Sequence, residues 1–274
     1  MGRKVIFLDI DGTLVNFSGE LPDSARRALV LARQNGHALV ICTGRTPTQV
    51  QKGLISSGLF DGVVCAAGAE VHLGDKLLLR HFIDQDKLDG LVDYLDSRGT
   101  YYFLQGADDM YGSQSVADYR RELFGDNPQL ASERAKNFGH VTILDNIHDA
   151  QRIEKVVYHR SPDSYDQLRR AVGPDFTVVG SSFGRFGSGD GEIMARGYDK
   201  ATGMQCLLNA VGVPQKDSIA FGDSENDLAM LEYAGTSVAM GSGSPVVQER
   251  ADFVTTGVDE DGLWNGFKAL GLLG

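Results

Sequence analysis

The sequence predicts an α/β fold, with a doubly wound (Rossmann-like) parallel-sheet core and an inserted α+β module. Three observations lead to this prediction. Short, continuously apolar runs alternate with amphipathic helical stretches over the first 80 residues, and the same rhythm returns in the last third of the chain. Such runs are typical of parallel strands that helices cover on both faces. The segment between these two parts has a mixed helix-and-strand character of its own.

The N-terminal part of the core contains three expected strands and two expected helices. The strands are the apolar runs at residues 5–9, 38–43 and 62–65. Residues 22–35 carry apolar side chains at helical spacing and end before a glycine, which predicts a helix with a glycine cap. Residues 48–57 form the second expected helix.

The C-terminal part resumes the alternation of helix and strand. Expected helices lie at residues 200–211 and 226–233, and expected strands at 218–222, 237–240 and 252–255. The middle segment predicts helices at 86–97 and 165–172 and strands at 101–104, 155–159 and 176–179. The Gly/Ser-rich stretch 180–191 is the expected linker. We therefore expect a core of residues 1–80 and 190–274, with residues 81–189 inserted into it.

Composition limits the classes of partner. The 274 residues carry a formal net charge of −11, which argues against nucleic acid or an anionic membrane surface as a partner. No apolar run approaches the ~20 residues of a membrane span, and no signal peptide is evident. The three cysteines read as core thiols in a reducing compartment. These features predict a cytoplasmic protein, and they leave its oligomeric state open.

Candidate functional side chains follow the apolar runs, where ligands bind in parallel sheets. Asp9 and Asp11 end the first run, Thr43 and Gly44 the second, and Lys200 begins a later helix. After the strand at 218–222 come three more polar candidates, namely Asp223, Asn226 and Asp227. Carboxylates packed together are costly unless a cation is present, and oxygen ligands favour Mg²⁺. The pattern therefore predicts a magnesium site at one edge of the sheet.

Phosphoryl transfer is the chemistry that this set of residues favours. A carboxylate at a strand end can attack phosphorus, which divides hydrolysis into two easier steps. A second carboxyl two residues later can protonate the leaving alkoxide and then deprotonate the attacking water. Thr43 and Lys200 are placed to hold the phosphoryl oxygens as charge shifts in the transition state.

Four motifs resemble those of the haloacid dehalogenase superfamily of phosphotransferases. Asp9-Ile-Asp11-Gly-Thr-Leu-Val matches the first motif, Thr43 the second, Lys200 the third and Gly222-Asp-Ser-Glu-Asn-Asp227 the fourth. Their order, and an insertion between the second and third motifs, resemble the Cof-type sugar-phosphatase branch. The resemblance to the core is close, whereas the inserted segment, called the cap in that branch, matches only in length and α/β character.

The resemblance implies a role for each matching residue. Asp9 would be the nucleophile and a Mg²⁺ ligand, and Asp11 the acid/base, which also offers a backbone carbonyl to the metal. Thr43, Lys200 and the backbone amide of Gly44 would bind the phosphoryl group. Three residues of the fourth motif would complete the site: Asp223 as a metal ligand, Asp227 from the first or second coordination shell, and Asn226 toward the phosphate or Lys200.

The chain departs from the family pattern at two places. Ala66-Ala67-Gly68 stands where many relatives carry Asn-Gly after the third strand, and Gly241-Ser242 replaces a common Gly-Asn. Neither belongs to the catalytic set. Within the Gly/Ser-rich linker, Arg185 is the cap residue to test first as a specificity contact.

These observations predict a Mg²⁺-dependent phosphatase that acts on a small-molecule phosphomonoester, such as a sugar phosphate or a phosphorylated cofactor. A sizeable inserted cap favours small substrates because it excludes large ones. A phosphomutase that returns the phosphoryl group to a second hydroxyl is the alternative within the same chemistry. A catalytically silent relative used for binding or regulation is the alternative of another class.

Overall fold

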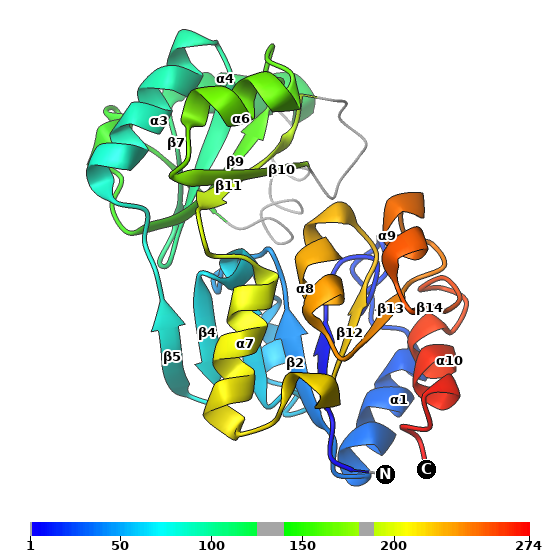
Figure 1. Ribbon diagram of the computed structural model, residues 1–274. Helices are drawn as coiled ribbons and strands as arrows, with labels where there is room; N and C mark the ends of the chain where they lie inside the picture. Colours follow the sequence, from blue (N-terminus) through cyan, green and yellow to red (C-terminus); the bar gives the residue numbers. More distant parts are fainter. Residues whose placement is uncertain (1, 125–139, 181–188) are drawn as a thin grey trace. The chain divides into compact units, whose positions relative to one another are not determined.

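The computed structural model describes residues 2–124, 140–180 and 189–274 (Figure 1). The chain forms two compact units, each with its own sheet. The first consists of Met1–Gly44, Gln51–Arg80 and Tyr198–Gly274, and the second of Arg45–Val50 and His81–Gly197. The proposed specificity residue Arg185 lies outside the described residues. Among the described helices, none has the length and apolar character needed to cross a membrane.

The first unit is built on an eight-stranded sheet in the order β14-β13-β12-β1-β2-β3-β4-β5. Its strands are β1 (Val5–Leu8), β2 (Ala38–Cys42), β3 (Gly62–Cys65), β4 (Glu70–Leu73), β5 (Lys76–Arg80), β12 (Ser218–Gly222), β13 (Thr236–Ala239) and β14 (Phe253–Val254). Neighbouring strands from β14 to β3 are parallel, and β4 and β5 are antiparallel additions. The predicted doubly wound core is therefore confirmed.

Helices of the first unit cover both faces of this sheet. They are α1 (Asp23–Gln34), α2 (Lys52–Ile55), α7 (Lys200–Val211), α8 (Leu228–Tyr233), α9 (Pro245–Arg250) and α10 (Gly262–Ala269), with short 3-10 turns η1 (Ala66–Gly68), η3 (Gln215–Asp217) and η4 (Glu225–Asp227). Every residue of β1 and β2 is buried. Because alternate side chains of a strand point to opposite faces, neither face of the central sheet is open to water.

The second unit has a six-stranded sheet in the order β10-β11-β9-β6-β7-β8. The strands are β6 (Tyr101–Gly106), β7 (Met110–Gly112), β8 (Val141–Ile143), β9 (Ile153–His159), β10 (Phe176–Gly180) and β11 (Gly191–Ala195); the helices are α3 (Gln85–Ser97), α4 (Gln114–Phe124) and α6 (Tyr165–Val172), with the 3-10 turn η2 (Ile147–Asp149). Side chains of α3 and α6 form a core with alternate residues of β6 and β9, among them Tyr102 and Val156.

Two expectations differ from the structure. The boundary expected at residue 190 comes too early, because β11 pairs with β10 on one side and β9 on the other. The chain therefore stays in the second unit through Gly197. The helix expected at 48–57 is reduced to α2. Thr46 donates through both its backbone N–H and its hydroxyl to the Gln49 side chain, and such local bonds compete with helix formation.

Candidate active site

The carboxyl ends of β1, β2 and β12 lie side by side in the first unit. β1 pairs in parallel with β12 on one side and with β2 on the other. Asp9, Thr43 and Asp223 directly follow these three strands, so the sheet itself brings them to one edge. The backbone N–H of Asp9 continues the pairing by donating to the carbonyl of Phe221 at 3.1 Å. All three side chains are buried.

Lys200 joins this group from the first residue of α7. Its side chain has no exposed surface, and its Nζ lies 2.6 Å from Asp9 Oδ1. The same ammonium also donates to Asp227 Oδ1. Asp199 caps the helix by accepting a hydrogen bond from the backbone N–H of Thr202 at 2.8 Å. A single buried cation therefore bridges two carboxylates that lie far apart in the sequence.

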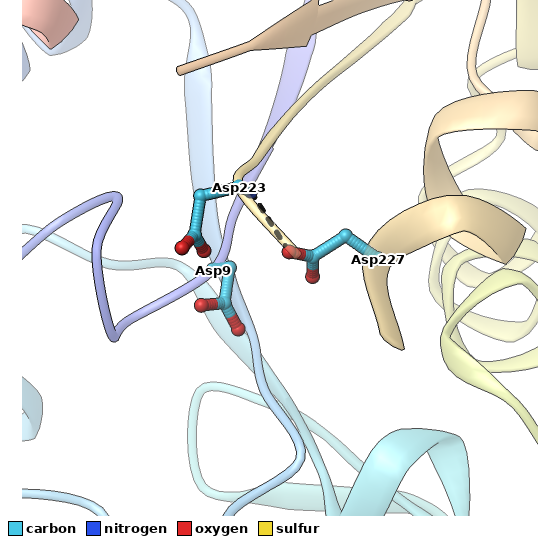
Figure 2. Close-up of side chains that lie close together, drawn as sticks. All are labelled: Asp9, Asp223 and Asp227. Carbon is cyan, nitrogen blue, oxygen red and sulfur yellow. Dashed lines mark hydrogen bonds between the residues drawn. The ribbon is translucent and has the colours of Figure 1, made fainter. Parts of the chain in front are cut away.

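Asp227 is fully buried, and donors from the protein engage both of its oxygens. Lys200 binds Oδ1, whereas the backbone N–H groups of Asp223 and Ser224 donate to Oδ2 at 3.0 and 3.1 Å. Figure 2 shows this contact between Asp223 and Asp227, with the Asp9 carboxylate beside them. The Ser224 hydroxyl approaches the same oxygen at 3.4 Å. Asp227 thus fixes both Lys200 and the backbone that carries Asp223.

Asp223 differs from Asp227 because one of its oxygens lacks a partner. Its Oδ1 is buried and makes no hydrogen bond among the described residues. A methyl carbon built on Gly12 would lie 2.4 Å from Asp223 Oδ2, so only glycine fits beside that carboxylate. The carbonyl of Asp223 accepts a hydrogen bond from the Ser244 N–H at 2.8 Å, which fixes the backbone of Asp223.

The electrostatics of the site favour a further cation. Burial raises the pKa of Asp9 to about 7; Lys200 opposes this rise, whereas Asp227 and Asp11 add to it. The pKa of Asp223 is likewise raised to about 8, mainly by burial and then by the negative charges of Asp9 and Asp227. Burial disfavours the charged Lys200, but Asp227 and Asp9 outweigh it and hold its pKa well above the usual range. More negative than positive charge is buried here.

Three carboxylates form a group that could hold a metal ion. Asp9, Asp223 and Asp227 each offer an oxygen, and these three atoms lie within 4.8 Å of one another. The donor set is all oxygen, which suits Mg²⁺. The unpartnered Asp223 Oδ1 is the kind of buried polar atom that an ion would satisfy. The residues present therefore fit a divalent cation.

The other predicted site residues lie around this group. Asp11 is half-buried and forms an isolated bridge with Val15; its carboxylate is not part of the three-oxygen group within the described chain. Gly44 is buried directly after Thr43. The Asn226 side chain bonds locally, since its Oδ1 accepts from the Ser224 hydroxyl at 2.9 Å, and it makes no hydrogen bond with Lys200 in the described part of the chain.

Two contributors to the site were missed by sequence reasoning. Gly243 packs against the backbone of Asp223, where a methyl carbon would lie 2.6 Å from the Asp223 carbonyl oxygen. Gly68 packs still more closely against Asp199, the residue before Lys200, where a methyl carbon would lie 1.8 Å from the carbonyl oxygen. The Gly-Ser-rich run after β13 and the Ala-Ala-Gly turn after β3 were visible in the sequence. Their partners were not, because both contacts are tertiary.

Known proteins resemble this chain over nearly its whole length. A model of the haloacid dehalogenase-like hydrolases matches residues 6–267. The chain is 29% identical over 273 residues to the putative phosphatase YkrA of Bacillus subtilis, covering 100% of both proteins. It is 28% identical over 277 residues to the 5-amino-6-(5-phospho-D-ribitylamino)uracil phosphatase YwtE of Bacillus subtilis, covering 95% of each.

Solved structures show the same fold. The subclass IIB sugar phosphatase BT4131 superposes with a TM-score of 0.83 at 24% identity, over 98% of this chain and 99% of that one. The family match extends over both parts of the core and the segment inserted between them. The chain therefore belongs to the haloacid dehalogenase-like hydrolases, in their Cof-type branch, and it is a phosphatase.

Proposed function

We propose that this phosphatase hydrolyses a small phosphorylated metabolite through an aspartyl-phosphate on Asp9, with Mg²⁺ as its metal ion. One observation carries the proposal: the buried Lys200 ammonium lies 2.6 Å from Asp9 at the carboxyl end of β1. Burial favours the protonated form of this carboxylate, and its pKa is about 7 with Lys200 already opposing that rise. The lysine favours the ionised form, and only that form is a nucleophile.

Mg²⁺ would be held by Asp9, Asp223 and the backbone carbonyl of Asp11. Asp227 would act from the second coordination shell, because both of its oxygens already accept hydrogen bonds from the protein. The unpartnered Asp223 Oδ1 supports this assignment. When bound, the ion would offset the negative charge of the carboxylates and of the phosphoryl oxygens.

In the first half-reaction, a carboxylate oxygen of Asp9 attacks phosphorus. The bond between phosphorus and the ester oxygen breaks, and the alkoxide leaves with a proton from Asp11. Lys200, Thr43 and the amide of Gly44 hold the phosphoryl oxygens while this charge moves. The buried position of these groups strengthens their interactions, since little water competes for them.

In the second half-reaction, Asp11 accepts a proton from a water molecule that attacks the same phosphorus. The bond between phosphorus and the Asp9 oxygen breaks, which releases inorganic phosphate and restores the carboxylate. Asp11 is then protonated and ready for the next substrate, so the two half-reactions form a closed cycle.

The substrate is a small phosphomonoester, a sugar phosphate or a phosphorylated cofactor. Support comes from relatives at similar identity whose names specify 5-amino-6-(5-phospho-D-ribitylamino)uracil as their substrate. We assign substrate selection to the second unit, as the specificity cap. A cytoplasmic location belongs to the same proposal, and the three core thiols, Cys42, Cys65 and Cys206, agree with a reducing compartment.

Asp9→Asn tests the covalent route. The variant should fold normally and release no phosphate from p-nitrophenyl phosphate or from a panel of phosphorylated metabolites with Mg²⁺, because an amide cannot form the acyl phosphate. Asp75→Asn is the matched control: Asp75 is exposed in the same unit, and its loss should leave turnover unchanged. Turnover by Asp9→Asn close to that of the wild type would contradict the proposal. Phosphate release without an added bisphosphate would separate hydrolysis from a mutase reaction.

A further inference from the structure

A turn of three residues directly after β3 has an unusual backbone conformation. Ala66, Ala67 and Gly68 have φ angles of 47°, 52° and 101°, all in the left-handed region. Alanine rarely adopts this conformation, because its Cβ approaches the neighbouring carbonyl oxygen. Strain of this kind persists only where the surrounding structure imposes it, and it concentrates at functional sites. All three residues are buried.

The turn contacts Thr43 and Asp199, the residue before Lys200, through backbone atoms. On one side, the Ala67 N–H donates to the carbonyl of Thr43 at 3.1 Å. On the other, the first turn of α7 lies directly on Gly68: a methyl carbon on Gly68 would lie 1.8 Å from the Asp199 carbonyl oxygen. Gly203 makes the reciprocal approach, with its Cβ position 3.1 Å from the Gly68 Cα.

Asp199 transmits this contact to Lys200, the next residue. Its side chain is fixed as the helix cap through Thr202, so its carbonyl cannot move without moving the start of α7. The Lys200 side chain has no exposed surface, and two carboxylates hold its Nζ. A shift of the Asp199 backbone would therefore move the ammonium away from Asp9.

We propose that Ala66–Gly68 is a positioning element that sets Thr43 and Lys200 in one rigid frame around Asp9. The left-handed conformation brings the backbone of the turn against α7 with no side chain in between, and it points the Ala67 N–H at Thr43. Strain in the two alanines is retained because relaxing it would displace both contacts. The inference rests on the role proposed above for Lys200.

Gly68→Ala tests the contact with α7, and Gly212→Ala is its matched control. Gly212 ends the same helix with φ 67°, and a methyl group there meets nothing within 4 Å. Both changes place an alanine at a positive φ angle, which strains the backbone. Only the change at Gly68 forces Asp199 to move. Gly68→Ala should lower kcat/KM for p-nitrophenyl phosphate about 100-fold, the effect of a displacement near 1 Å. Its inhibition by orthovanadate, a phosphoryl mimic, should weaken in parallel.

A second pair of variants covers the case in which Gly68→Ala does not fold. Ala67→Gly accepts the left-handed conformation and should keep wild-type kcat and vanadate inhibition. Ala67→Val cannot adopt it, because a β-branched side chain is excluded there, and it should lose both. A purely structural role would change the melting temperature of these variants and leave the kcat of the folded protein intact.

The outcomes decide the inference separately from the proposed function. The inference is overturned if folded Gly68→Ala turns over like the wild type, if Gly212→Ala loses as much activity, or if both Ala67 variants behave alike. An inactive wild type would refute the proposed function instead. A crystal structure of Gly68→Ala, or of Ala67→Val, then decides the inference by itself: Lys200 Nζ should lie out of hydrogen-bond reach of Asp9, and an unchanged contact overturns the inference.

Discussion

At the scale of single residues, the site is defined by an imbalance of buried charge. One ammonium, that of Lys200, serves Asp9 and Asp227, and the Asp223 carboxylate is left with a buried oxygen to which no described residue donates a hydrogen bond. Burial of an uncompensated carboxylate favours its protonated form. The raised pKa values of Asp9 and Asp223, about 7 and about 8, are the consequence.

These pKa values predict how Mg²⁺ stabilises the protein at different pH. Both carboxyls have folded pKa values above the ordinary 3.8, so the metal-free folded protein binds more protons than the unfolded chain. The contribution of these two carboxyls to its stability should therefore fall as the pH rises from about 4 through about 8. Mg²⁺ binds the ionised carboxylates, so its increase of the melting temperature should be larger at about pH 8 than at about pH 5.5.

Thermal unfolding with Mg²⁺, or with NaCl at matched ionic strength, measures this difference. In Asp223→Asn the extra gain at the higher pH should disappear, because the carboxylate with the unpartnered oxygen is gone. Equal gains at both pH values in the wild type would show that ionisation of these carboxyls does not control metal binding.

At the scale of elements, the hairpin β4–β5 holds an ion pair between a buried carboxylate and a half-buried arginine, which the mechanism does not use. Glu70 has no exposed surface, and it lies opposite Arg80 in the strand register. Arg80 donates to both Glu70 oxygens, with Nη2 2.9 Å from Oε1, and His72 contacts the same carboxylate. Such a pair is costly to break from one side, because removing Arg80 would take most of the compensating positive charge from the buried carboxylate.

Arg80→Met should lower the free energy of unfolding by about 3–5 kcal/mol. Urea unfolding of the full chain measures it. Combining Glu70→Leu with Arg80→Met should recover most of the loss, because no buried charge remains. Arg250→Met is the control, since it breaks an exposed pair with Glu232 and should leave stability nearly unchanged. A double variant as unstable as Arg80→Met would show that packing, and not charge, accounts for the loss.

At the scale of the whole molecule, the two units have separate cores and separate sheets. The three carboxylates of the candidate metal site all belong to the first unit. A net charge of −11 also works against an anionic substrate, so the cations at the site must reverse the local field. The proposed metal binding would therefore be a property of the first unit.

Hydrogen exchange of the full chain should reveal this separation. Mg²⁺ alone should slow exchange in β1 and β12, which carry the site, and leave β6 and β9 of the second unit unchanged, because only the first unit gains contacts. Asp223→Asn should abolish the effect. Equal protection of both units by Mg²⁺ alone would contradict it.

The sequence by itself determined the fold class and the order of the chemical groups along the chain. Apolar runs predicted β1, β2, β3 and β12, because a strand buried on both faces needs a continuous run of apolar side chains. The groups after those runs lie at one edge because parallel strands end there together. The hairpin β4–β5 and strand β11 escaped prediction, since their short segments mix apolar side chains with polar or charged ones.

Only the tertiary structure decided which of those groups share a partner. Three features depend on atoms that packing brings together. Lys200 bridges Asp9 and Asp227, Asp223 keeps an oxygen without a hydrogen bond from the described residues, and Gly68 packs against Asp199. A local pattern reports the period and polarity of a segment, and these follow from neighbouring residues. Distances between segments follow from how helices and strands pack, and no local pattern contains them.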